Sequence, residues 1–148
     1  MRPTAAKTKM KRIIKNYLPT LTYHGIGAYT PDGASRDMRA RNKRLKESRA
    51  LLLANEEKFE AACAWINSLD RTREINRRHT SYFIKHIAER RIGLGHIANG
   101  TLIAAALHCG FKFEQSRQAP NLLFNIDEES LQSAYEESLK FDKCPECA

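Results

Sequence analysis

The stretch that decides the fold is Ile97-Ala98-Asn99-Gly100-Thr101-Leu102-Ile103-Ala104-Ala105-Ala106-Leu107-His108-Cys109-Gly110-Phe111. Between its two ends, the only polar side chains are those of Thr101 and His108. A helix that is apolar on nearly every side is normally buried. We expect Asn99 to cap its start through the side-chain oxygen, and Gly110 to adopt the left-handed conformation after its last turn. The stretch therefore predicts a short central helix around which a small, mostly helical domain packs.

The segment before the central helix predicts three more helices. Neither Gly nor Pro occurs from residue 34 to residue 92, and this favours helix because these two residues are the poorest helix formers. We expect a polar helix over 36–54, an amphipathic helix over 55–69, and a second amphipathic helix that starts at Thr80 or Ser81 and ends before Gly93. Residues 70–79 interrupt the apolar pattern with four arginines and predict a polar connection.

The period of the pattern changes after the central helix. Phe111 and Phe113 alternate with charged residues, and an apolar run over 122–126 follows a Pro-containing loop, which predicts a β-hairpin over residues 111–126. Asp127 is placed to cap a last helix. The predicted fold class is mainly α with one antiparallel β-hairpin (α+β), and the order of elements resembles that of a winged helix.

The chain is long enough for one domain, and its charge is uneven. Of its 148 residues, 1–50 hold 13 Lys/Arg and 3 Asp/Glu, whereas 51–148 hold 12 and 14. We therefore divide it into a basic N-terminal arm and linker (1–35), a single helical domain (36–142) and a C-terminal tail (143–148). The arm is either a disordered solubilising segment or a nucleic-acid-binding segment that orders on contact.

Several classes of protein are excluded by pattern. No apolar run approaches the roughly 20 residues that cross a bilayer, and no secretory signal is recognisable, so we expect a cytoplasmic protein without a membrane partner. Cys63 and Cys109 fall in helices predicted to be buried, which indicates thiols in a reducing compartment. Since no H-E-x-x-H motif and no Ser/His/Asp set can be assembled, we do not expect an enzyme.

Cys144 and Cys147 form a C-x-x-C pair near the end of the chain. This is half of a structural zinc site, because zinc takes four ligands. The site would be completed by His108 and Cys109, or by a second copy of the chain in a zinc-stabilised dimer. The alternative is a frayed tail that binds no metal. No other cofactor is expected.

Basic side chains are the strongest functional signal. Guanidinium groups bind phosphate bidentately, and phosphate contacts position a protein on nucleic acid without reading its bases. The central helix offers mainly small apolar side chains, so it cannot read base edges. The alternative for residues 71–91 is a solvated segment with ion pairs to the acidic helix after residue 127. The predicted nucleic-acid contacts are Lys7, Lys9, Lys11, Arg12, Lys15, Arg39, Arg41, Lys43, Arg44, Arg71, Arg73, Arg77, Arg78, Lys85, Arg90 and Arg91.

Three segments carry a resemblance to other proteins. They are Arg78-His79-Thr80-Ser81-Tyr82 with Ile84-Lys85-His86-Ile87-Ala88-Glu89, then Ile97 to Phe111, then Pro120-Asn121-Leu122-Leu123-Phe124-Asn125-Ile126. Over residues 72–126 the chain resembles small uncharacterised proteins of bacterial phages, plasmids and integrative elements. The resemblance implies a bacterial mobile-element setting and assigns no catalytic residues.

Two functions follow from these observations. The first is a nucleic-acid-binding protein of a bacterial mobile element that contacts phosphates with little base-specific readout. The alternative is a protein-interaction module or inhibitor that acts on a host nucleic-acid-handling (defence) complex, where the basic surface occupies an acidic or phosphate-binding site. A homo-oligomer is compatible with either function.

Overall fold

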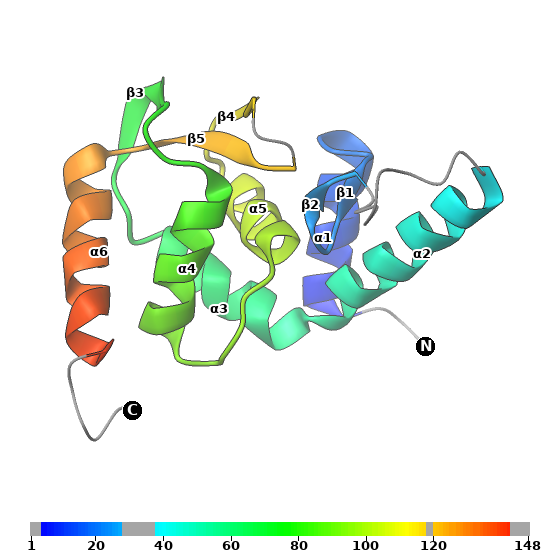
Figure 1. The fold of residues 1–148 in the computed structure, drawn as a ribbon, viewed down its shortest axis with the longest axis horizontal. Helices are drawn as coiled ribbons and strands as arrows, with labels where there is room; N and C mark the ends of the chain where they lie inside the picture. The colour runs from blue at the N-terminus through cyan, green and yellow to red at the C-terminus, as the bar shows by residue number, and fades with distance from the viewer. Residues whose placement is uncertain (1–3, 28–37, 118–119, 143–148) are drawn as a thin grey trace.

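A computed structural model of the chain describes residues 4–27, 38–117 and 120–142. Residues 141 and 142 are described by their backbone alone. In this part of the chain, six helices and five strands follow in order (Figure 1). They are α1 (Ala5–Asn16), β1 (Leu21–Thr22), β2 (Gly25–Ile26), α2 (Met38–Ala54), α3 (Glu56–Ile66), β3 (Arg71–Asn76), α4 (Ser81–Ile92), α5 (Asn99–His108), β4 (Phe113–Gln115), β5 (Leu122–Ile126) and α6 (Glu128–Asp142).

The strands form two small antiparallel sheets. One is the β1–β2 hairpin, and the other is a three-stranded sheet in the order β3-β5-β4. The mostly helical α+β class is confirmed, and β4 and β5 are the predicted hairpin over 111–126. The β1–β2 hairpin and the third strand β3 were not expected from the sequence.

Helix α5 lies in the middle of the molecule, with α4 on one side and α1 on the other (Figure 1). All its residues from Asn99 to Leu107 are buried. The predicted end of the helix is confirmed, since Gly110 has a φ of +87°. The Phe111 N–H donates to the Ala106 carbonyl at 3.1 Å, so the chain folds back onto the last turn.

The start of α5 differs from the expectation. Ala98 occupies the capping position without a side-chain cap, and Asn99 is the first helical residue. The Asn99 Nδ2 instead donates to the His24 carbonyl at 3.1 Å and to the Asn121 Oδ1 at 2.9 Å. Asn99 therefore connects α5 to the β1–β2 hairpin and to the loop before β5, because its amide donates to one acceptor in each of those two segments.

Gly100 brings the β1–β2 hairpin into direct backbone contact with α5. Its N–H donates to the Tyr23 carbonyl at 3.0 Å. A Cβ at position 100 would lie 1.8 Å from the Thr22 carbonyl oxygen, a separation that no carbon and oxygen tolerate without displacement of the backbone. The hairpin can therefore sit on the helix only because residue 100 has no side chain.

The described part of the predicted arm belongs to the domain. Ala6, Met10 and Ile13 lie at helical spacing on α1 and are buried in the same hydrophobic core as α5. The expectation of an N-terminal arm is therefore corrected for residues 4–27. Tyr17, the residue that caps the C-terminal end of this helix, is 56% exposed. Residues 28–37, the rest of the predicted linker, lie outside the described residues.

Strand β3 corrects the prediction of an irregular polar connection over residues 70–79. Its first four residues are exposed, so neither face shows the apolar alternation that marks a half-buried strand. It is an edge strand that pairs with β5 and departs from regular register between Arg71 and Asn76. The Asn125 Nδ2 supports it by donating to the Thr72 carbonyl at 2.8 Å.

The run α3-β3-α4-α5-β4-β5, with β3 paired to β5, has the element order of a winged helix. In a helix-turn-helix protein the second helix of the motif enters the major groove of DNA. That position is held here by α5, which contacts α1 and β2 as well as α3 and α4. The surface that reads DNA in helix-turn-helix proteins is therefore interior in this domain.

Replacement of Gly100 with alanine tests the close contact between the hairpin and α5. In an ordinary helix interior, Gly→Ala raises the free energy of unfolding by roughly 0.5–1 kcal/mol. We expect Gly100→Ala to lower it by about 2–4 kcal/mol, because the added methyl group displaces the Thr22 backbone. Urea unfolding followed by circular dichroism measures the change, and a neutral or stabilised variant would contradict the contact.

Candidate nucleic-acid interface

The predicted phosphate contacts fall in three separate parts of the molecule. One group lies on α1, a second on α2, and a third on β3, α4 and the segment between them. Figure 1 shows α1 and α2 at one end of the domain and β3 near α6 at the other. The sixteen side chains therefore do not form one continuous basic face.

The α1 group is partly used to hold α1 against α3. Lys7 lies 3.5 Å from the Glu56 carboxylate, and Lys9 lies 3.3 Å from that of Glu60. The remaining members are exposed; they are Lys11, Arg12 and Lys15. Exposed ion pairs of this kind contribute little stability, so their role is mainly to orient the two helices.

The α2 group lies along a helix that extends from the body of the domain (Figure 1). Arg39, Arg41 and Lys43 are exposed, whereas Arg44 is half-buried. Arg49, which was not predicted to have a role, donates to the Pro19 and Leu21 carbonyls and ties α2 to the segment before β1. Arg39, Arg41 and Lys43 face solvent along a helix that contributes only Ser48 and Leu52 to the buried interior.

Within the third group, the α4 cations are largely committed to the protein itself. Lys85 is only 4% exposed, and its Nζ lies 2.7 Å from the Glu89 carboxylate. The prediction that Lys85 belongs to an exposed basic surface is therefore wrong. Arg91 lies 3.0 Å from Glu137 on α6. Ion pairing between this segment and the acidic last helix, the alternative considered from the sequence, is therefore confirmed for Arg91.

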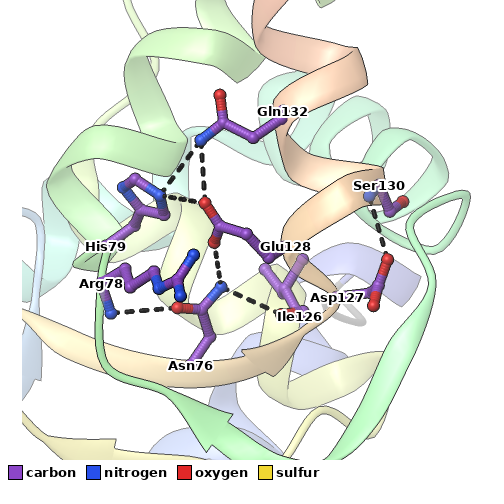
Figure 2. Close-up of polar contacts among 8 residues, drawn as sticks. All are labelled: Asn76, Arg78, His79, Ile126, Asp127, Glu128, Ser130 and Gln132. Carbon is purple, nitrogen blue, oxygen red and sulfur yellow. Dashed lines mark hydrogen bonds and ion pairs between the residues drawn. The ribbon is translucent and has the colours of Figure 1, made fainter.

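Glu128 at the start of α6 is the centre of a polar network that fixes the turn between β3 and α4 (Figure 2). Its carboxylate accepts from the Asn76 Nδ2 at 2.8 Å, and it lies 2.9 Å from the His79 ring and 2.9 Å from the Gln132 amide. The Asn76 Oδ1 accepts the Arg78 N–H at 3.0 Å. The network therefore sets the direction in which the chain presents Arg78.

The pKa of Glu128 is lowered by this network. Burial acts to raise the pKa, but the hydrogen bonds from Asn76, His79 and Gln132 outweigh it and lower the pKa to about 2. The carboxylate is consequently ionised throughout the range in which the protein would work.

Arg71 and Arg73 occupy the exposed edge strand β3. The Arg71 guanidinium lies 4.1 Å from the centre of the Phe111 ring and donates to the Asn67 Oδ1 at 2.9 Å. Arg73 is exposed beside it. The guanidinium of Arg71 is thus held in place by stacking, which lowers the entropy it would lose on contact with a phosphate.

The turn before α4 and the β4–β5 loop enclose a polar groove of about 610 Å³, which we call the arginine groove. Arg77 pairs with Glu114 at 2.7 Å. Arg78 and Arg117 are exposed, and neither side chain has an ion-pair partner among the described residues. The groove is lined by Arg77, Arg78, Thr80, Glu114, Gln115, Ser116, Arg117 and Leu123.

Arg117 was missed from the sequence because it is a single basic residue in a loop, outside any cluster of like charge. Its position in the loop of the β-hairpin was the signal that could have found it.

The predicted zinc ligands Cys144 and Cys147 lie outside the described residues. Within the described ranges, no group of three or more His, Cys, Asp or Glu side chains is placed to hold a metal ion. Cys63 and Cys109 are free thiols, as predicted, and the Cys109 Sγ lies 3.5 Å from the Cys63 carbonyl oxygen. A hydrogen bond from the Cys63 thiol and the nearby Arg71 charge lower the pKa of Cys109 to about 7, although burial acts to raise it.

Comparison with known proteins finds no matching family model, no matching curated protein and no matching solved structure. In the residues the structure describes, no helix combines the length and the apolar character needed to cross a bilayer.

Replacement of Glu128 with glutamine tests the network. A carboxylate whose folded-state pKa is about 2 contributes stability that is fully present above its ordinary pKa of 4.5 and is lost as the pH falls towards 2. Because the group keeps contact with water, we expect Glu128→Gln to lower the free energy of unfolding by about 1–2 kcal/mol at pH 7.

The difference between the wild type and Glu128→Gln should shrink in urea unfolding measured at successively lower pH between 5 and 3. Glu129→Gln, the same change at the exposed neighbouring position, is the control and should leave the stability nearly unchanged. A Glu128→Gln effect that is constant with pH would show that the carboxylate charge is not what stabilises the turn.

Proposed function

We propose that the protein binds nucleic acid through phosphate contacts centred on the arginine groove, with little readout of base sequence. The observation that carries the proposal is that Arg78 and Arg117 line the same groove without ion-pair partners among the described residues. An arginine side chain presents a planar fork of N–H donors that matches two phosphate oxygens. Thr80 and Gln115 add uncharged donors at the same place, as is common where a protein grips a phosphate backbone.

Weak base readout follows from the burial of α5. Reading a base edge in the major groove requires polar side chains on an exposed helix or strand. The helix in that position has no exposed residue between Asn99 and Leu107. Affinity would therefore come from charge, and it would depend steeply on salt.

Charge reversal at Arg78 and Arg117 tests the proposal against an effect of net charge alone. The double variant Arg78→Glu/Arg117→Glu and the control Lys58→Glu/Lys140→Glu change the net charge equally, and the control residues lie outside the groove. We expect the first to lower affinity for a labelled DNA by at least about tenfold at 50 mM salt. The slope of log affinity against log salt should fall by about 2, since two phosphate contacts are lost.

Fluorescence anisotropy across a salt titration measures both quantities for both double variants. Equal losses in the two would show that binding is not centred on the groove, and wild-type protein without salt-dependent binding would refute the proposal itself.

The alternative, a protein-interaction module, is favoured by a different surface. Helix α2 carries a groove of about 420 Å³ with Leu45, Ala50 and Leu53 along it and Lys46 and Arg49 beside them. An apolar groove with a basic rim suits an amphipathic acidic segment of a partner protein. Co-purification from a bacterial lysate with and without nuclease separates the two functions, because only a protein partner survives the nuclease.

A bacterial mobile-element setting, a cytoplasmic location, the absence of enzymatic activity and any homo-oligomer stay expectations from the sequence within this proposal.

A further inference from the structure

Another cavity, of about 420 Å³, lies between the β1–β2 hairpin, α4, the start of α5 and the residues just before β5. Its walls carry the rings of Tyr23, His24, Tyr82 and His96. Its lining residues come from segments that are separated in the chain. None of its lining residues belongs to the arginine groove.

The α4 wall is one ordered face of a helix. Tyr82, Lys85, His86 and Glu89 follow one another at spacings of three, one and three residues, which places them on the same side of α4. The Lys85 Nζ lies 5.3 Å from the centre of the Tyr82 ring, and the His86 ring meets it edge-on at 4.6 Å. The Tyr82 ring is therefore held by its neighbours while 52% of the residue stays exposed.

Glu89 fixes the base of this wall. Its carboxylate lies 2.7 Å from the Lys85 Nζ, 3.0 Å from the His96 ring and 3.1 Å from the Ile97 N–H. An ammonium group has three N–H donors, and Glu89 takes one of those of Lys85. Lys85 thus brings a buried positive charge with spare donors to the cavity, and Glu89 prevents it from moving away.

The opposite wall is the turn at Tyr23 and His24, which line the cavity and are held through their backbone. The Tyr23 N–H donates to the Ser48 Oγ at 3.2 Å, and the Tyr23 and His24 carbonyls accept from Gly100 and Asn99. The turn is therefore anchored on α2 and on α5.

Unused hydrogen-bonding groups border the cavity. The Asn99 Nδ2 makes two hydrogen bonds, which fixes the orientation of that amide, and its Oδ1 is buried without a hydrogen-bond partner. The Oδ1 of Asn121 accepts from Asn99, so its Nδ2 donors are turned away from that residue. A buried acceptor without a partner is costly, so Asn99 would gain a hydrogen bond if a donor reached its Oδ1.

We propose that this cavity binds a nucleobase. Aromatic rings beside a flat apolar space stack on the faces of a base, and amide and ammonium groups meet its hydrogen-bonding edge. The two sites adjoin, because the Ser116 N–H of the groove donates to the Asn121 carbonyl of the cavity at 3.2 Å, and Thr80 of the groove lies two residues before Tyr82 of the cavity. The source of the base is an unpaired nucleotide of a strand whose phosphates lie in the groove, and in this respect the inference rests on the proposed function.

The test compares Tyr82→Ala with Tyr17→Ala, the same change at a tyrosine of similar exposure on α1, and with Tyr82→Phe, which keeps the ring. Each variant is titrated by anisotropy against a labelled single-stranded oligonucleotide and against a blunt duplex of the same sequence. We expect Tyr82→Ala to bind the single strand roughly 5- to 100-fold more weakly, the effect of losing one stacked base, with duplex binding unchanged. Tyr82→Phe and Tyr17→Ala should bind the single strand as the wild type does.

Titration with adenosine monophosphate, followed by NMR, distinguishes the two sources of the base. Wild-type binding that Tyr82→Ala abolishes would identify a free nucleotide as a ligand of the cavity, whereas the single-strand effect without such binding would identify an unpaired base of a polynucleotide. A Tyr82→Ala protein that matches the wild type on all three ligands would overturn the nucleobase site. That result would leave the phosphate function standing as long as Arg78→Glu/Arg117→Glu still weakens duplex binding.

Discussion

The contact between the backbone of the β1–β2 hairpin and the N-terminal end of α5 is the constraint on which the rest of the structure depends. Gly100 allows the two backbones to meet, and Asn99 fastens α5 both to the hairpin and to the residue before β5. Since α1 immediately precedes the hairpin, the same contact brings α1 onto α5. One pair of adjacent residues thus joins the N-terminal segment, the central helix and the sheet into a single core.

As a consequence of this contact, α5 has no solvent-exposed side between Asn99 and Leu107. A domain with a winged-helix order of elements usually leaves its second motif helix exposed for DNA. The two sites that we propose therefore lie outside the surface of that helix. Arginine side chains gather where the β4–β5 loop meets the turn before α4, and aromatic rings gather where the hairpin, α4 and the start of α5 meet.

Much of the fold could be predicted where the sequence pattern is local. The end of α5 at Gly110 and the cap of α6 at Asp127 depend on residues adjacent in the chain, and both are confirmed. The packing of α1 was missed because Met10 and its apolar neighbours lie within a basic run whose charge dominated the interpretation. Strand β3 was missed because its partner β5 is remote in sequence and its exposed edge position removes the alternation of apolar and polar residues.

The candidate site was less predictable than the fold for a related reason. Charge shows which side chains could bind a phosphate. Burial and ion pairing determine which of these side chains stay available to a ligand, and both depend on tertiary contacts. Lys85 is enclosed with Glu89, whereas the isolated Arg117 comes to line the same groove as Arg78.

Native-state hydrogen exchange of the amides of α1 and α5 tests most directly the central claim that the two helices share one core. Our account predicts that both exchange only by global unfolding, with the same free energy. Rapid exchange of α1 while α5 stays protected would show that the N-terminal segment is an arm after all.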